Sequence, residues 1–263
     1  TQLNVPDVGR RFAMTWDGDG EFTFLGVDPI AVDKARRRLT FVFRPGNKFV
    51  RIVRTDPRGK GDYVRNVKIF REDRADLVAA GEIFNPDMLD YLKPFGSLRF
   101  MDWMATNNSP VETWDDRARV DQARWSLDAG VPVEIMVELA NRMAADPWFT
   151  LPHLADDDFV SNFAALAAAS LDPDLMVYVE FSNEVWNGIF DQSGWARDQG
   201  LAAGLSSDDY QAQLFFYSRR AVQVHGLFEE AFGSADRLVR VMATQAANAW
   251  VSDQVLSFED AYT

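Results

Sequence analysis

The chain has 263 residues, 47% of them hydrophobic, so it can form one large domain or two modest ones with a sizeable core. Its formal net charge of −13 disfavours anionic partners, and we expect no binding to nucleic acid or to a membrane surface. The absence of cysteine excludes disulfides and thiolate metal sites, and two histidines are too few for most zinc sites. No apolar run approaches the roughly 20 residues that a membrane-spanning helix requires.

Residues 1–64 are predicted to form a small β-rich domain. Short runs of β-branched and aromatic residues are separated by Gly-, Pro- and Asp-containing turns, which is typical of antiparallel strands. The expected strands cover residues 22–25, 38–43 and 49–53. We therefore expect a small antiparallel sheet or part of a β-sandwich.

In residues 65–263 the pattern changes to strands that alternate with helices. Strands are expected at 67–70, 97–103, 148–153, 176–181 and 238–242, with a sixth beginning at Phe258. Helices are expected at 85–92, 132–144, 158–170, 207–232 and 246–256. Such alternation predicts right-handed βαβ units and a parallel sheet. The predicted fold class is α/β, a TIM-type (β/α) barrel that is incomplete, because a closed barrel has eight strands and five to six are visible here.

A polar cluster follows the strand expected at 176–181. Barrel enzymes place their chemistry at the carboxyl ends of strands, and strand periodicity would aim Glu184 into the barrel mouth with Asn183 beside it. Partial burial against Phe181 and Trp186 would raise the pKa of Glu184, as a general acid for a glycosidic oxygen requires. The alternative is that Asn183 and Glu184 merely cap the following segment.

Other polar residues are expected to converge on this cluster. Glu180 lies deeper in the strand and must be paired if it is charged, and Arg99 on a neighbouring strand is the expected partner. Asp102 could face the same mouth, although a structural pairing is the favoured interpretation. For His153 the functional and structural interpretations are balanced, whereas His225 lies in a long helix and is interpreted as structural.

Three tryptophans are expected near strand ends. The aromatic faces of Trp103, Trp148 and Trp186 could stack on pyranose rings, although each could equally belong to a core. Trp186 is the strongest candidate, and Asn187 beside it is a further candidate contact for a sugar hydroxyl. A polar loop at 107–109 could also contact sugar hydroxyls.

The acidic run 156–158 could suggest calcium, because hard cations prefer clustered oxygen ligands. Three consecutive side chains cannot all face one ion in regular structure, and negative charge suits a helix N-terminus. A helix start is therefore the favoured interpretation, and we expect no metal and no cofactor.

The motif Glu180-x-x-Asn183-Glu184 at the end of a fourth barrel strand resembles the Asn-Glu signature of glycoside hydrolase clan A. That clan includes cellulases, mannanases and xylanases with (β/α)₈ barrels. The runs 98–104, 147–158 and 182–187 also look like a bacterial group often labelled cellulose-binding or hydrolase-like, and the resemblance covers about residues 64–256. It implies that Glu184 is the acid/base, that His153 lies near the catalytic pair, and that a second glutamate ends strand seven. No counterpart of strand seven is visible.

The expected function is therefore a glycoside hydrolase that acts on a β-linked polysaccharide or oligosaccharide, in an extracellular or periplasmic location. The catalytic candidates are Glu184, Asn183 and His153, and the substrate-binding candidates are Arg99, Asp102, Trp103, Trp148, Trp186 and Asn187. The alternative is a non-catalytic carbohydrate-binding protein, or a truncated barrel that lacks the nucleophile. A homo-oligomer that completes the barrel is a third possibility.

Overall fold

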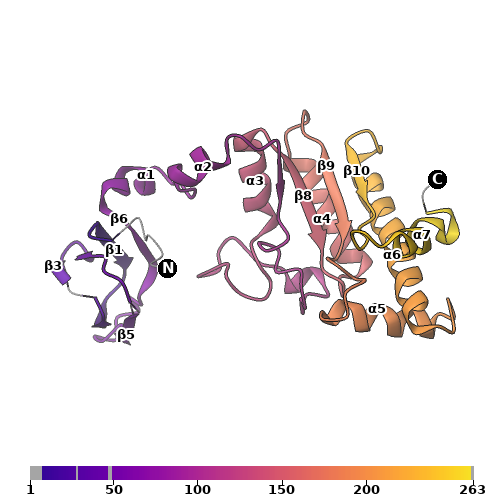
Figure 1. Cartoon of the computed structure of the whole chain (residues 1–263). Coiled ribbons are helices and arrows are strands. Elements are labelled where there is room, and N and C mark those ends of the chain that lie inside the picture. Colours follow the sequence, from indigo (N-terminus) through magenta and orange to yellow (C-terminus); the bar gives the residue numbers. More distant parts are fainter. Residues whose placement is uncertain (1–7, 28, 47–48, 262–263) are drawn as a thin grey trace. The chain divides into compact units, whose positions relative to one another are not determined.

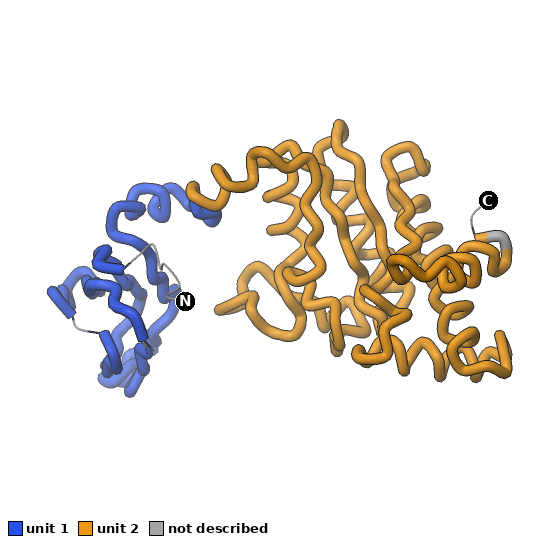
Figure 2. The backbone as a smooth tube through the Cα atoms, in the orientation of Figure 1, with its two compact units in different colours: residues 1–85 blue, residues 86–263 orange. Residues whose placement is uncertain are grey.

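The computed structural model describes residues 8–27, 29–46 and 49–261. The chain forms two compact units, residues 1–85 and 86–263 (Figure 2). Its fold is mixed α/β: the first unit contains antiparallel sheets, and the second contains a four-stranded parallel sheet (Figure 1).

The first unit consists of two antiparallel sheets around a small core. One has the strand order β3 (Pro29–Asp33), β4 (Arg38–Val42), β1 (Arg11–Asp17), β6 (Arg65–Arg71), and the other pairs β2 (Gly20–Leu25) with β5 (Phe49–Thr55). The core contains Met14, Trp16, Val27, Leu39 and Phe41, and it is flanked by Phe12, Phe22, Phe24, Val50 and Val64. The three strands expected at 22–25, 38–43 and 49–53 are confirmed as β2, β4 and β5.

The strand expected at 67–70 exists as β6 but has a different partner. It pairs antiparallel with β1, with Ala13 opposite Phe70, and is followed by a short 3₁₀ helix (Glu72–Arg74) and α1 (Ala75–Ala79). It therefore belongs to the first unit, which ends at Asn85 rather than at the expected residue 64. A short strand's own sequence reports its pleated geometry but does not identify its partner, which here lies about fifty residues away.

The second unit is built on a parallel sheet with the order β10 (Leu238–Val241), β9 (Val177–Phe181), β8 (Asp146–Leu151), β7 (Ser97–Arg99). α2 (Pro86–Leu92) precedes β7. α3 (Val133–Met143) connects β7 to β8, and α4 (Asp157–Ser170) connects β8 to β9. α5 (Asp191–Ala202) and α6 (Asp209–Phe232) connect β9 to β10, and α7 (Ala249–Ser257) follows β10. The expected helices are confirmed with small shifts at their ends, and α5 is an additional helix.

Alternation along the strands gives this sheet two different faces. Phe149 and Phe181 point toward the helices, where Phe149 meets Phe163 of α4 at 5.0 Å between ring centroids and Phe181 stacks on Tyr217 of α6 at 6.1 Å. The alternate residues of the same strands point to the other face of the sheet. On that face the register aligns Arg99 with Trp148, Trp148 with Tyr178 and Thr150 with Glu180. The polar side chains of the sheet therefore gather on the face opposite these helices.

The parallel sheet has four strands, fewer than the five to six expected. One of the missing strands is β6, described above. The other was expected from Phe258, where the chain instead forms a 3₁₀ helix (Phe258–Asp260). The strand expected at 97–103 ends at Arg99, because Met104 N donates to Phe100 O at 2.8 Å and closes a turn. Asp102 and Trp103 consequently lie in a turn rather than in a strand. Among the helices of the described residues, none is long and apolar enough to cross a membrane.

Candidate active site

The chain leaves β9 in a strained conformation. Ser182 and Glu184 have φ values of +59° and +44°, in the left-handed region that residues other than glycine rarely occupy, and Asn183 lies between them. Glu184 O then accepts a hydrogen bond from Asn187 N at 2.8 Å, which closes a turn. Such backbone conformations cost on the order of 1–3 kcal/mol each and cluster at functional sites. This segment is therefore held in place by contacts from the surrounding structure.

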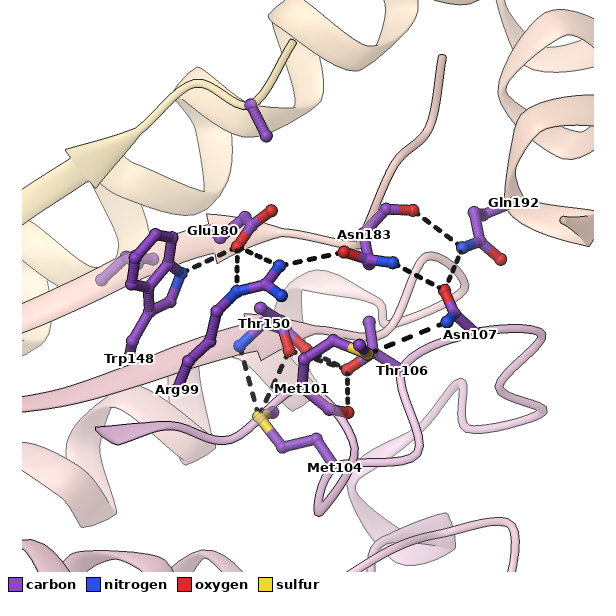
Figure 3. Close-up of polar contacts among 12 residues, drawn as sticks. Arg99, Met101, Met104, Thr106, Asn107, Trp148, Thr150, Glu180, Asn183 and Gln192 are labelled. Atoms are coloured by element: carbon purple, nitrogen blue, oxygen red, sulfur yellow. Dashed lines mark hydrogen bonds and ion pairs between the residues drawn. The ribbon is translucent and has the colours of Figure 1, made fainter. Parts of the chain in front are cut away.

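Glu180, the last polar residue within β9, is buried and paired (Figure 3). Its Oε2 accepts hydrogen bonds from Arg99 Nη2 at 2.8 Å, Arg99 Nε at 3.2 Å and Trp148 Nε1 at 2.7 Å. Burial raises the pKa of Glu180, the contacts from Arg99 and Trp148 oppose that rise, and the negative charge of Glu184 adds to it. The expected pairing of Arg99 with Glu180 is confirmed.

Asn183 is the centre of a second set of hydrogen bonds, which joins three segments of the chain (Figure 3). Its Oδ1 accepts from Arg99 Nη2 at 2.9 Å, and its Nδ2 donates to Asn107 Oδ1 at 3.0 Å. Gln192 Nε2 donates at 2.8 Å both to Asn107 Oδ1 and to the Asn183 carbonyl oxygen. Asn183 is 6% exposed and Gln192 is fully buried, so the side-chain amide of Asn183 has a defined orientation.

Glu184 lies in a different environment from Glu180, four residues earlier. It is half-buried, and its Oε2 accepts one hydrogen bond, from Asn187 Nδ2 at 2.8 Å. Glu180 is neutralised by a guanidinium, whereas Glu184 is contacted by an uncharged amide. When two carboxyl groups share one site, such a difference in surroundings gives them different roles. Among the described residues, Glu184 is thus the carboxyl with fewer hydrogen bonds and without a cationic partner.

His153 lies two residues beyond the end of β8 and outside both sets of hydrogen bonds. It is 4% exposed, its ring meets Trp195 edge-on at 5.5 Å, and its Nδ1 has no hydrogen-bond partner among the described residues. Burial lowers the pKa of His153, partly offset by the charge of Asp191, so the imidazole is neutral at pH 7. A neutral ring with an unsatisfied nitrogen can accept or donate one further hydrogen bond.

Two of the expected sugar contacts lie in the turn after β7. Asp102 is exposed, and no hydrogen bond joins its carboxylate to the described residues of the network. Trp103 is half-buried against Phe100, with 5.6 Å between ring centroids. The structure therefore does not bring Asp102 into the cluster around Glu180.

The other two tryptophans have neighbours of their own. Trp148 lies within β8 rather than at its end, and its ring stacks on Tyr178 at 5.4 Å while the Arg99 guanidinium lies 5.1 Å from the ring centroid. Trp186 is half-buried, and its carbonyl oxygen accepts from Tyr210 Oη at 3.3 Å.

The acidic run at 156–158 begins α4, where Asp156 Oδ1 accepts from Phe159 N at 2.7 Å. Within the described residues no group of three His, Asp or Glu is placed to hold a metal ion.

Gln192 was not identified from the sequence, because it belongs to the unpredicted helix α5. Two glycines in twelve residues weaken the helical signal of α5, and one of them, Gly200, is required by packing. A Cβ atom at Gly200 would lie 2.1 Å from the Ala212 carbonyl oxygen of α6. Asn107 was considered only as a sugar contact, and its bonds to Asn183 and Gln192 are long-range contacts that sequence spacing does not show.

No protein-family model matches the chain, and comparison with curated proteins and with solved structures likewise gave no match. The function is therefore argued from the arrangement of the site itself.

Proposed function

We propose that the protein is a glycoside hydrolase that acts on a β-linked polysaccharide, with Glu184 as general acid/base. The observation that carries the proposal is the contrast between two carboxyl groups, that of Glu180 within β9 and that of Glu184 just beyond its end. Glu180 is buried and neutralised by Arg99. The half-buried Glu184 itself has a left-handed φ and follows the hydrogen-bonded Asn183, and among the described residues its carboxylate accepts a hydrogen bond only from the Asn187 amide.

In this proposal Glu184 protonates the glycosidic oxygen as the leaving sugar departs and then accepts a proton from the attacking water. Asn183 uses one N–H for Asn107, so its second N–H can donate to a sugar hydroxyl. His153 would supply a further hydrogen bond through Nδ1, which has no partner among the described residues. The proposed sugar contacts are Trp103, Trp148, Trp186, Asn187, Arg99 and Asp102.

A glycosidase also needs a second carboxyl, about 5–5.5 Å from the first in a retaining enzyme and about 6.5–9.5 Å in an inverting one. The negative charge of Glu184 raises the pKa of Glu180, so the two carboxyls interact. However, Glu180 is a poor nucleophile, because its Oε2 accepts three hydrogen bonds and its side chain is only 2% exposed. In this account the second carboxyl comes from a segment outside the cluster around β9.

We further propose that the parallel sheet is part of a TIM-type (β/α) barrel. Within the described residues β7 pairs only with β8 and β10 only with β9, so each outer strand can accept a neighbour. A second copy of the chain is the proposed source of the remaining strands and of the second carboxyl. Light scattering after size exclusion tests this directly, since a homo-oligomer predicts at least twice the mass of one chain.

The second candidate is a non-catalytic carbohydrate-binding protein. It is favoured by one observation, the absence of a second unpaired carboxyl from the described hydrogen-bond cluster around Glu184. Release of new reducing ends from a β-glucan, a mannan and a xylan separates the two functions. Hydrolysis of one polymer supports the enzyme, whereas saturable binding without new ends supports the binding protein. An extracellular or periplasmic location would suit either function, because polymers of this kind are met outside the cytoplasm.

A further inference from the structure

Gln192 is a buried polar side chain whose two polar atoms are both used. It is 0% exposed and lies at the start of α5. Its Oε1 accepts from the backbone N–H of Asn108 at 3.0 Å, and its Nε2 donates at 2.8 Å to the backbone carbonyl of Asn183. A backbone N–H can only donate and a backbone C=O can only accept, so these two contacts determine which end of the Gln192 amide carries the nitrogen.

The orientation of Gln192 in turn determines that of Asn107. The second hydrogen of Gln192 Nε2 is donated to Asn107 Oδ1 at 2.8 Å. If the Asn107 amide were rotated by half a turn, its NH₂ group would face a donor and the hydrogen bond would be lost. A buried amide that loses its hydrogen-bond partner is destabilised, and this penalty holds the Asn107 amide in one orientation.

Asn107 then imposes an orientation on Asn183. Its Oδ1 accepts from Asn183 Nδ2 at 3.0 Å, while Arg99 Nη2 donates to Asn183 Oδ1 at 2.9 Å. Both neighbours therefore require the Asn183 nitrogen to lie on the side of Asn107. One N–H of Asn183 is satisfied there, and the other has no acceptor among the residues that the structure describes, so it can donate to an acceptor oxygen of a ligand.

We propose that Gln192 is a positioning residue of this site, which acts through Asn107 to present one N–H of Asn183 to an acceptor oxygen of the ligand. The inference rests on the proposed function for the nature of that acceptor, a sugar hydroxyl or ring oxygen. The relay also couples the loop after β7 to the start of α5, because Asp191 N donates to Asn108 Oδ1 at 2.8 Å. Gln192 itself does not touch the ligand.

The test compares Gln192→Glu and Gln192→Leu in the full chain. Glutamate keeps the shape of glutamine but, when ionised, donates no hydrogen bond, and leucine removes both polar ends. The matched control makes the same changes at Gln211, a half-buried glutamine that donates to Gln254 Oε1 at 3.0 Å and lies outside the network. Thermal unfolding of every variant identifies losses that come from stability alone.

The decisive readout is the side-chain amide signal of Asn183 in ¹⁵N–¹H spectra, assigned by its loss in Asn183→Asp. We expect two well-separated proton shifts in the wild type, one for the bonded and one for the free hydrogen, and convergence of the two in both Gln192 variants but in neither Gln211 variant. Unchanged Asn183 signals in the Gln192 variants would overturn the proposal. Asn107→Ala, at a half-buried position, breaks the same relay at its middle and decides the question if the Gln192 variants do not fold.

Activity provides a second readout that is independent of the first. With a glycan that the wild type hydrolyses, we expect the substitutions at Gln192 to lower kcat by about tenfold or more and to leave KM near the wild-type value. Misorientation of a group near the reacting bond predicts this pattern. A loss equal to that of the Gln211 variants would argue against a positioning role. If the wild type hydrolyses no glycan, the proposed function fails, while the amide spectra still test the role of Gln192.

Discussion

Replacement of Arg99 by methionine tests the pairing that holds the site together. Methionine retains much of the aliphatic length of arginine but removes the guanidinium, which makes two of the three hydrogen bonds to Glu180 Oε2 and one to Asn183 Oδ1. Glu180 would keep only the indole N–H of Trp148. An almost fully buried carboxyl would then lack a counter-charge.

The size of the effect follows from burial. Removal of one partner from a buried ion pair costs about 3–5 kcal/mol, because the other charge stays buried and uncompensated. The Glu180 side chain is 2% exposed but that of Arg99 is 34% exposed, so water can replace part of the lost contact and the lower end, about 3 kcal/mol, is expected. For a unit of this size that corresponds to roughly 6–12 °C in the unfolding temperature.

Glu180→Gln should cost less, about 1–2 kcal/mol, because the exposed side of Arg99 can be hydrated once its partner is neutral. In Arg99→Met/Glu180→Gln the buried charge is gone, so the double variant should be more stable than Arg99→Met alone. Scanning calorimetry of the full chain at pH 7 measures all three. A change of less than 0.5 °C in Arg99→Met, or a double variant less stable than either single one, would refute the reasoning.

Three further predictions concern the scaffold. Burial lowers the pKa of His225 to about 4 from its ordinary 6.5, so on acidification the unfolded chain takes up a proton before the folded chain does. The free energy of unfolding should therefore fall by roughly 3 kcal/mol between pH 6.5 and 4. His225→Gln should flatten that part of the pH profile of stability measured by urea denaturation. Asp156→Ala should cost about 1 kcal/mol by removing the N-cap of α4, whereas a similar loss from the exposed Asp158→Ala would contradict a capping effect. Gly130→Ala should lower the unfolding temperature, because φ is +72° and a Cβ would lie 2.3 Å from the Trp103 carbonyl oxygen; a fully stable variant would show that this turn can shift.

Local signals in the sequence predict much of the second unit. α6 begins close to the expected residue 207, with the Asp208 side chain accepting from Gln211 N as its cap, and α4 begins within the acidic run. The apolar run of β9 also lies where expected. These features depend on hydrogen bonds and periodicity within a few residues, which one sequence shows directly.

The pairing of Arg99 with Glu180 was predictable for a different reason. A glutamate inside an apolar strand must be compensated, and the arginine that was expected on a neighbouring strand supplies the charge, although β8 lies between β7 with Arg99 and β9 with Glu180. That argument needs only charge and burial, so it succeeds across 81 positions of sequence.

Features that depend on long-range contacts could not be obtained in this way. β6 has the composition of a barrel strand, yet its edge is paired with β1. The run from Leu98 to Met104 is mostly apolar, with Arg99 and Asp102 as its charged residues, and the turn that ends β7 becomes visible only from the backbone hydrogen bond between Met104 and Phe100. Gln192 has no local signal at all, because its role depends on Asn107 and Asn183, 85 and 9 positions away.

The central claim, that Glu184 is a general acid, is tested most directly by comparing leaving groups. When a β-glycan is cleaved, the sugar oxygen that leaves must be protonated. In the matching dinitrophenyl glycoside the dinitrophenolate leaves without a proton. The account predicts that Glu184→Gln, with an unchanged unfolding temperature, loses at least about 100-fold in kcat/KM for the glycan and far less in kcat/KM for the aryl glycoside, since kcat/KM reports the step in which the leaving group departs. Equal losses on both substrates, or unchanged hydrolysis of the glycan, would contradict it.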